Sequence, residues 1–218
     1  MYKHFFKRLL DILLSGAGIV VLSIPMSVVV FVIKKEDPGP AIFKQKRVGK
    51  GKEYFELYKF RSMKLSTPHD TPTHLLANPE QYLLKCGTWM RKYSVDELPQ
   101  LFNILKGDMS IIGPRPALWN QDDLIAERDK YGANDVKPGL TGWAQINGRD
   151  ELEIPVKAKL DGEYVEKLSF LFDCRCFIGT IFSVLNHKGV VEGGTGAIAV
   201  QSEKVACLEK INEEMVNE

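Results

Sequence analysis

Twenty-two consecutive residues, from Ile12 to Ile33, carry no charged side chain. A helix of about 20 apolar residues matches the hydrocarbon core of a bilayer, which is about 30 Å thick. The run is longer than the apolar core of a cleaved signal peptide, about 7–15 residues, and no A-x-A-like cleavage site follows it. The sequence therefore predicts a retained helix that lies in a membrane.

The middle and the flanks of this segment determine its predicted topology. Pro25 removes a backbone donor and clashes with the preceding turn, so we expect a break or kink there, with Ser23 near the freed backbone groups. Basic residues flank both ends, and the positive-inside rule places each flank in the cytoplasm. A bent, re-entrant helix satisfies both flanks, whereas the alternative, a straight span, satisfies one. The flanking residues are Lys3, Lys7, Arg8, Lys34 and Lys35.

The net charge of the chain is close to zero, but the charge is unevenly distributed. The 29 basic and 28 acidic residues exclude a generally basic nucleic-acid binder, and 44% hydrophobic residues exclude a disordered chain. Residues 1–64 hold 13 basic and 5 acidic residues, whereas residues 65–218 hold 16 and 23. The basic excess accompanies the membrane segment, so we expect anionic membrane lipids as partners and no nucleic acid.

The remaining pattern predicts an α+β fold that is mostly helical. Two stretches rich in aromatic and β-branched residues, 41–49 and 54–63, indicate a short basic β-hairpin. The helix expected over 170–186 is apolar but interrupted by charges, so it either lies at the membrane interface or packs in the core. We expect a re-entrant membrane helix over 1–36, a catalytic domain with interfacial amphipathic helices over 37–187, and a tail over 188–218. Other helices are expected at about 80–92, 96–106, 118–131 and 151–167, with loops at 65–80 and 136–149 and a turn at 111–116.

Asp96 and Glu97 are adjacent carboxylates at the start of the helix expected over 96–106. Ser94 and Glu97 fit a capping box, so one interpretation gives the acids only a capping role. If Asp96 is the N-cap, Pro99 falls in the first turn, where proline is tolerated. An ionised carboxylate at a helix start can also be a nucleophile or a metal ligand. The pair alone leaves capping and catalysis open.

Basic residues near the pair favour phosphate chemistry. Arg91 lies upstream, and Arg115 stands between two prolines in a segment typical of anion-binding turns. Arg149 ends a glycine-rich loop that also carries amides and Trp143. Together with a membrane segment, this set indicates Mg²⁺-assisted phosphoryl chemistry on a lipid phosphate.

These motifs resemble those of the small bacterial monotopic phosphoglycosyl transferases, the bacterial sugar transferase family. The resemblance covers most of residues 1–187 and rests on several long motifs in the right order. One departure is the residue between Ser23 and Pro25, because the family often has a direct Ser-Pro pair. The matching segments are the basic N-terminus, the membrane segment, Lys59–Met63, Asp96–Asn103, Lys106–Ser110, Gly113–Pro116 and Pro138–Arg149.

The resemblance implies transfer of a sugar-1-phosphate from a UDP-sugar to polyprenyl (undecaprenyl) phosphate, with release of UMP. This would be the first membrane step of glycoconjugate assembly, on the cytoplasmic face of the bacterial inner membrane. Asp96 would be the nucleophile that forms a covalent phosphosugar intermediate, and Glu97 would help to hold Mg²⁺ or manage protons. The implied ligands of Mg²⁺ are Asp96 and Glu97, and the implied phosphate- or substrate-binding residues are Lys59, Arg61, Arg91, Arg115 and Arg149.

Two other classes of function stay open from the sequence. A membrane-anchored scaffold or assembly protein would use the two carboxylates only to cap a helix. A membrane-associated phosphohydrolase would use water as the acceptor. The sequence names neither the sugar nor the glycoconjugate pathway, and it leaves the oligomeric state open, with a homo-oligomer as one option.

Overall fold

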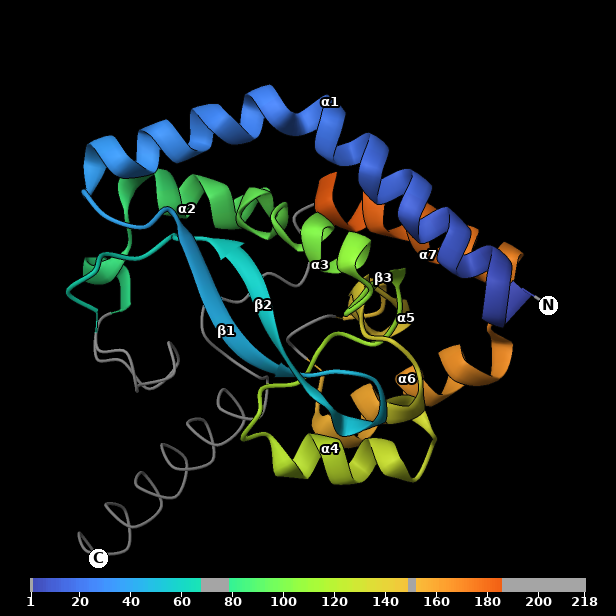
Figure 1. Ribbon diagram of the computed structural model, residues 1–218. Coiled ribbons are helices and arrows are strands. Elements are labelled where there is room, and N and C mark those ends of the chain that lie inside the picture. The colour runs from blue at the N-terminus through green and yellow to red at the C-terminus, as the bar shows by residue number, and fades with distance from the viewer. Residues whose placement is uncertain (1, 68–78, 149–151, 186–218) are drawn as a thin grey trace, which may run out of the picture.

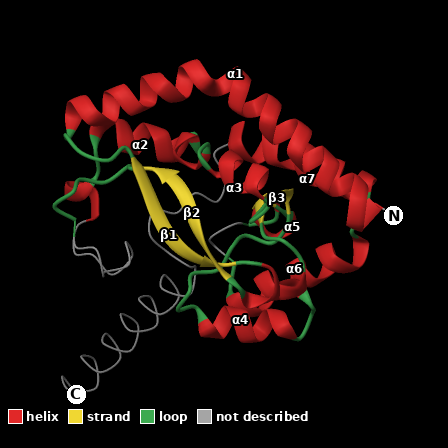
Figure 2. Ribbon diagram, in the orientation of Figure 1, coloured by secondary structure: helices red, strands yellow, loops and turns green. Residues whose placement is uncertain are grey.

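A computed structural model describes residues 2–67, 79–148 and 152–185. Within these ranges the chain has an α+β fold in which helices predominate, as predicted, and its strands form two small sheets (Figures 1 and 2). Arg149, the predicted tail over 188–218 and most of the predicted loop over 65–80 lie outside the described residues.

The apolar segment forms one long helix, α1 (Lys7–Glu36), which follows a short π-helical turn at Tyr2–Phe6. Among the described residues it is the one helix long and apolar enough to cross a membrane. Figure 1 shows that α1 curves along one side of the domain and bends near its middle. Pro25 lies inside α1, which continues as one helix through this position, so the predicted helix–break–helix is not seen there.

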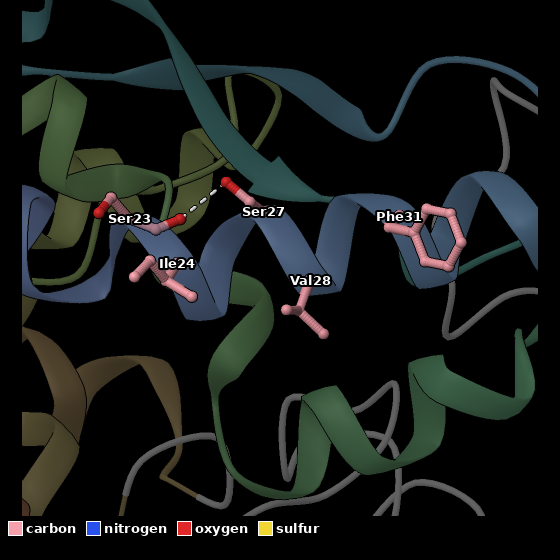
Figure 3. Close-up of a pocket in the computed structure, with 5 residues that line it drawn as sticks. All are labelled: Ser23, Ile24, Ser27, Val28 and Phe31. Atoms are coloured by element: carbon pink, nitrogen blue, oxygen red, sulfur yellow. Dashed lines mark hydrogen bonds between the residues drawn. The ribbon is translucent and has the colours of Figure 1, made fainter.

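Serine hydroxyls on both sides of Pro25 bond to the helix backbone. Ser23 Oγ donates to the carbonyl of Val20 at 2.7 Å, and Ser27 Oγ donates to the carbonyl of Ser23 at 2.8 Å. Both serines border a shallow pocket on the outer surface of α1, together with Ile24, Val28 and Phe31 (Figure 3). The three apolar side chains are more than half exposed, so this surface of α1 is apolar and uncovered by the described residues.

The N-terminal end of α1 is held by polar contacts to the globular domain. Arg8 donates hydrogen bonds to the carbonyls of Ile104 and Leu105, at 2.6 and 2.8 Å. These carbonyls belong to the last turn of α3 (Gln100–Lys106), where a cation is favourable. Asp11 is buried and accepts hydrogen bonds from Ser110 Oγ at 3.0 Å and from the N–H of Ile111 at 2.9 Å.

The C-terminal end of α1 is held by the same domain. Glu36 accepts hydrogen bonds from the backbone N–H groups of Lys85 and Cys86, at the start of α2 (Lys85–Lys92). Asp37, the next residue, pairs with Arg61. Both ends of the apolar helix therefore contact one globular unit.

The predicted hairpin is confirmed. Strands β1 (Ile42–Val48) and β2 (Tyr54–Phe60) pair antiparallel around a tight turn at Lys50–Lys52. Asn103 of α3 fixes the neighbouring backbone, because its amide donates to the carbonyl of Glu56 at 2.7 Å and accepts from the N–H of Tyr58 at 3.0 Å. This contact orients β2 relative to α3.

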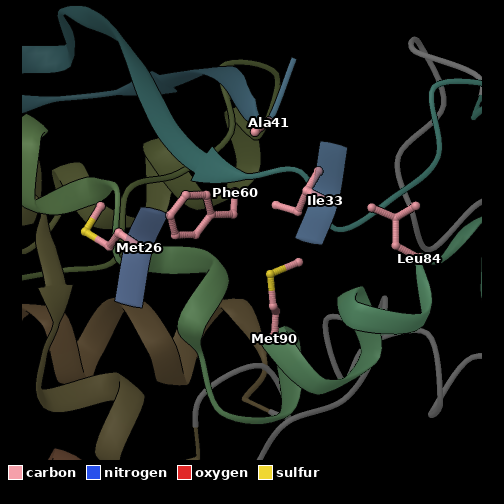
Figure 4. Close-up of a cluster of buried hydrophobic side chains, with 6 residues drawn as sticks. All are labelled: Met26, Ile33, Ala41, Phe60, Leu84 and Met90. Atoms are coloured by element: carbon pink, nitrogen blue, oxygen red, sulfur yellow. The ribbon is translucent and has the colours of Figure 1, made fainter. Parts of the chain in front are cut away.

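One apolar cluster joins α1 to the hairpin and to α2 (Figure 4). Ile33 of α1 and Phe60 of β2 are almost completely buried in it. The inner side of the apolar helix is thus part of the domain core, while its outer side is exposed. The cluster consists of Met26, Ile33, Ala41, Phe60, Leu84 and Met90.

The second sheet is one that the sequence did not predict. Strands β3 (Ser110–Ile112) and β4 (Gly139–Thr141) pair parallel, within segments predicted as a turn and a loop. The backbones meet so closely that a Cβ on Gly139 would lie 2.1 Å from the nitrogen of Gly113. The same predicted loop also contains a short helix, α5 (Trp143–Ile146).

The other predicted helices are present. The helices α2, α4 (Asp122–Asp129) and α6 (Ile154–Lys167) begin later than predicted, whereas α7 (Phe170–Leu185) begins at the predicted residue. A buried ion pair joins α4 to α6, because Arg128 Nε and Nη2 donate to Asp161 Oδ2 at 2.8 and 2.6 Å. Figure 1 shows α4 at the opposite side of the domain from α1.

Candidate active site

Asp96 and Glu97 lie in a 3₁₀ turn, Val95–Glu97, that precedes α3. The helix predicted over 96–106 is wrong at its start, since α3 begins at Gln100 with Pro99 as its N-cap. Proline has no backbone N–H to contribute to a helix interior, so the regular helix begins after it. Ser94 adopts a left-handed conformation (φ 56°) and makes no side-chain capping bond, so the predicted capping box does not form.

Glu97 accepts two charged hydrogen bonds instead. Lys59 Nζ on β2 and Arg115 Nη2, in the proline-flanked turn after β3, reach Glu97 Oε1 at 2.9 and 2.8 Å. Glu97 is only 7% exposed, and a buried carboxylate requires such compensation. Three segments distant in sequence therefore converge on this carboxylate.

Asp96 is also buried, but the nearest cationic group among the described residues lies farther from it than from Glu97. Lys59 Nζ lies 3.8 Å from Asp96 Oδ2, beyond hydrogen-bond range. Burial raises the pKa of Asp96, the charge of Lys59 lowers it, and the neighbouring Glu97 raises it. Arg91 and Arg115 lower this pKa as well, which places both guanidinium groups within electrostatic reach of Asp96.

The structure brings together three of the five predicted phosphate-binding residues, namely Lys59, Arg91 and Arg115. Arg91 also donates from Nε to Ser62 Oγ at 3.0 Å. Arg61 lies elsewhere, because its guanidinium binds Asp37 and the carbonyl of Pro40 at the end of α1. In this structure Arg61 links the end of α1 to the hairpin. The fifth residue, Arg149, is outside the described ranges.

A pocket of about 360 Å³ adjoins Glu97. Its lining includes residues that the sequence analysis did not single out, from β4, α5 and α7. Gln145 is one of them, and its Oε1 is buried without a hydrogen-bond partner among the described residues. Helical periodicity alone could not assign the α7 residues to a site, because the same pattern is typical of core packing. The lining comprises Ser94, Glu97, Leu98, Ile111, Leu140, Thr141, Gln145, Ile146, Phe177, Thr180, Ile181 and Ser183.

The donor set suits a magnesium ion that substrate completes. The described residues hold no cluster of three or more His, Cys, Asp or Glu side chains that would form a closed protein site. Mg²⁺ is commonly held by one or two carboxylates together with substrate phosphates and water. The adjacent carboxylates of Asp96 and Glu97 fit that pattern.

Comparison with known proteins identifies the class to which this site belongs. The model of the family described as "Bacterial sugar transferase" matches residues 2–187. The chain therefore belongs to the bacterial sugar transferase family, in agreement with the resemblance of its motifs.

Three relatives illustrate the similarity. "Uncharacterized sugar transferase EpsL" of Bacillus subtilis (strain 168) is 40% identical over 184 residues, which cover 84% of this chain and 89% of the relative. UDP-glucose:undecaprenyl-phosphate glucose-1-phosphate transferase of Escherichia coli (strain K12) is 35% identical, over 85% of this chain and 41% of the relative. UDP-N-acetylgalactosamine-undecaprenyl-phosphate N-acetylgalactosaminephosphotransferase of Aeromonas hydrophila is 37% identical, over 85% and 45%. The chain thus spans less than half of the length of the latter two proteins.

Proposed function

We propose that this protein transfers a sugar-1-phosphate from a UDP-sugar to polyprenyl phosphate at a membrane surface and releases UMP. The observation that carries this proposal is the buried Asp96–Glu97 pair with Lys59, Arg91 and Arg115 around it. Relatives named as undecaprenyl-phosphate sugar phosphotransferases support the substrate class. The reaction would begin the assembly of a glycoconjugate.

In the first step, a carboxylate oxygen of Asp96 attacks the β-phosphorus of the UDP-sugar. A bond forms between that oxygen and phosphorus, and the bond from phosphorus to the bridging oxygen breaks. The electron pair leaves with UMP, and the sugar phosphate stays on Asp96 as an acyl phosphate. Asp96 suits this role because Glu97 takes the close hydrogen bonds of Lys59 and Arg115, while Lys59 stays 3.8 Å from Asp96.

In the second step, a phosphate oxygen of the lipid acceptor attacks the same phosphorus. The bond from Asp96 to phosphorus breaks, which restores the carboxylate and yields polyprenyl diphosphate sugar. Two separate steps let UMP depart before the lipid phosphate arrives. The site therefore never holds the intact donor and the lipid phosphate at the same time.

The cationic side chains reduce the repulsion between the carboxylates and the substrate phosphates. Arg115 and Lys59 already hold Glu97 and are close enough to contact a phosphate beside it. Arg91 contributes positive charge near Asp96. Asp96 and Glu97 would hold Mg²⁺, and the ion would supply positive charge that offsets the charge of the substrate phosphates. Fixed charges in a buried site need no rearrangement during the reaction.

We also propose the re-entrant topology, with the catalytic domain on the cytoplasmic face. Both ends of α1 contact one globular domain, through Arg8 and Asp11 at one end and Glu36 at the other. A straight span would place these ends on opposite sides of the bilayer. Single cysteines at positions 3 and 50 should be labelled from the same side in oriented membranes, and labelling from opposite sides would contradict the topology.

The test of the proposed activity is a panel of UDP-sugars in detergent or nanodiscs, with UMP release as the readout. We expect turnover with at least one sugar, dependence on Mg²⁺, and loss of turnover with EDTA that added Mg²⁺ restores. A scaffold protein would release no UMP with any donor. A phosphohydrolase would sustain multiple turnovers without polyprenyl phosphate, whereas the proposed transferase requires it.

A further inference from the structure

The pocket beside Glu97 has one polar end and one apolar wall. Glu97 and Ser94 line the polar end, and Glu97 also carries the hydrogen bonds from Lys59 and Arg115. The wall is mainly aliphatic and aromatic, with side chains from the segment after Asp96, from β3 and β4, from α5 and from α7. The polar side chains of Thr141, Gln145, Thr180 and Ser183 also line it. Its large apolar residues are Leu98, Ile111, Leu140, Ile146, Phe177 and Ile181.

The α7 side of this pocket continues into an exposed apolar surface. Phe177 and Ile181 line the pocket and are also about half exposed, at 50% and 47%, so they form its rim. Ile178 and Phe182 are exposed beside them on the same helix but do not line the pocket. The pocket therefore connects Glu97 with a surface suited to lipid.

We propose that this pocket receives the head-proximal isoprene units of the polyprenyl phosphate acceptor. The phosphate lies toward Glu97 and its cations, and the rest of the chain leaves over Ile181 of α7 into the membrane. This inference rests on the proposed function and assigns the acceptor, one of its two substrates, to this pocket. A volume of about 360 Å³ is at the lower end of the range for ligand pockets, so it encloses only the first part of a long chain.

The chemistry of the pocket distinguishes the acceptor from the donor. A UDP-sugar is polar along its whole length and would leave the apolar wall in contact with hydroxyl and phosphate groups. An isoprenyl phosphate has one anionic end and a branched apolar chain, which match the two ends of the pocket. Because the chain comes from lipid, which is as apolar as the pocket, burial adds little affinity. The contribution is therefore the position of the phosphate relative to Asp96.

The test compares two isoleucines of α7 that have similar exposure. Ile181→Trp obstructs the rim, and Ile178→Trp makes the same change three residues away, outside the lining. Both variants are assayed in nanodiscs with the UDP-sugar that the wild type uses. Without acceptor, the amount and rate of single-turnover UMP release should stay at the wild-type level in both variants. With undecaprenyl phosphate, kcat/KM for the acceptor should fall at least about tenfold in Ile181→Trp and less than about twofold in Ile178→Trp.

Two results would overturn the acceptor assignment while leaving the proposed function intact. One is an equal acceptor kcat/KM in the two variants. The other is loss of acceptor-independent UMP release in Ile181→Trp, because the pocket would then serve the donor step. Absence of UMP release from wild-type protein with every donor tested would instead contradict the proposed function itself.

Photocrosslinking gives a second readout that does not depend on turnover. A benzoylphenylalanine is placed at position 181 or 178, and labelled undecaprenyl phosphate is the probe. We expect stronger labelling from position 181, reduced by unlabelled farnesyl phosphate, and weak labelling from 178 that farnesyl phosphate leaves unchanged. Equal, uncompeted labelling at both positions would show contact with bulk lipid and would overturn the proposal.

Discussion

Asp96 and Asp161 are both buried near cationic side chains, but their surroundings differ. Asp161 is 1% exposed and receives two hydrogen bonds from Arg128, at 2.8 and 2.6 Å, between α4 and α6. Asp96 is 7% exposed, stands next to a second acid, and has Lys59 Nζ at 3.8 Å. One acid matched by one base is typical of a structural ion pair. Adjacent acids beside a pocket are typical of a catalytic site, so the neighbours distinguish the sites better than burial does.

The largest effect that tests this contrast is on activity at Asp96. Asp96→Asn should lower UMP release by about 10³-fold or more, because the amide cannot serve as the nucleophile. Burial raises the pKa of Asp96, so its ionisation opposes folding as the pH rises through that pKa. The thermal midpoint of Asp96→Asn at neutral pH should therefore equal or exceed that of the wild type. If Asp96→Asn lost much stability but kept its activity, Asp96 would have a structural role like that of Asp161.

The next effect is on stability at Asp161. Asp161→Asn leaves the buried guanidinium of Arg128 without its carboxylate, and we expect a loss of about 3–5 kcal/mol in the free energy of unfolding. Activity per folded molecule should stay near that of the wild type. Denaturant unfolding and UMP release, measured on the same preparation, check both statements.

A double substitution serves as the control for that experiment. Arg128→Met combined with Asp161→Leu removes both charges and should recover most of the lost stability. If the double variant were as unstable as Asp161→Asn, the packing of α4 on α6 rather than the unpaired charge would be responsible.

A smaller effect concerns the pH dependence of activity. The nucleophile must be ionised, so activity falls as the pH drops through the raised pKa of Asp96. Lys59 lowers that pKa, so Lys59→Met should raise it further and move the acidic limb of kcat/KM to higher pH. Lys44→Met is the matched control on the same hairpin, and the acidic limb of kcat/KM should not move in this variant. If the acidic limb of kcat/KM did not move in Lys59→Met, Lys59 would not lower the pKa of Asp96.

The smallest effect is expected at the exposed ion pair of the hairpin. Lys44 Nζ lies 2.9 Å from Glu56 Oε2, and both side chains are more than half exposed. Exposed ion pairs contribute little to stability because water screens both charges, so Lys44→Met should leave the denaturant midpoint of unfolding close to that of the wild type. A loss comparable to that of Asp161→Asn would mean that exposure does not separate weak pairs from strong ones here.

The sequence predicted the parts of this fold that depend on local pattern. The hairpin follows from two stretches rich in aromatic and β-branched residues around a glycine-containing turn. The pairing of β3 with β4 could not be predicted, because short parallel strands separated by a helix carry little local signal. Arg61 and Arg115 show the same limit of sequence-based prediction for the candidate site residues. Both arginines stand in segments that resemble family motifs, but only the tertiary structure places Arg115 on Glu97 and Arg61 on Asp37.

The central claim is that Asp96 carries the sugar phosphate between the two substrates. Its most direct test is mass spectrometry of the intact protein and of its proteolytic peptides after rapid acid quench of the enzyme with its UDP-sugar and Mg²⁺, without acceptor. The account predicts a mass increase of one sugar phosphate on the peptide that contains Asp96, its loss when undecaprenyl phosphate is added, and no adduct in Asp96→Asn. Turnover by Asp96→Asn at the wild-type rate, or an adduct mapped to another residue, would contradict it.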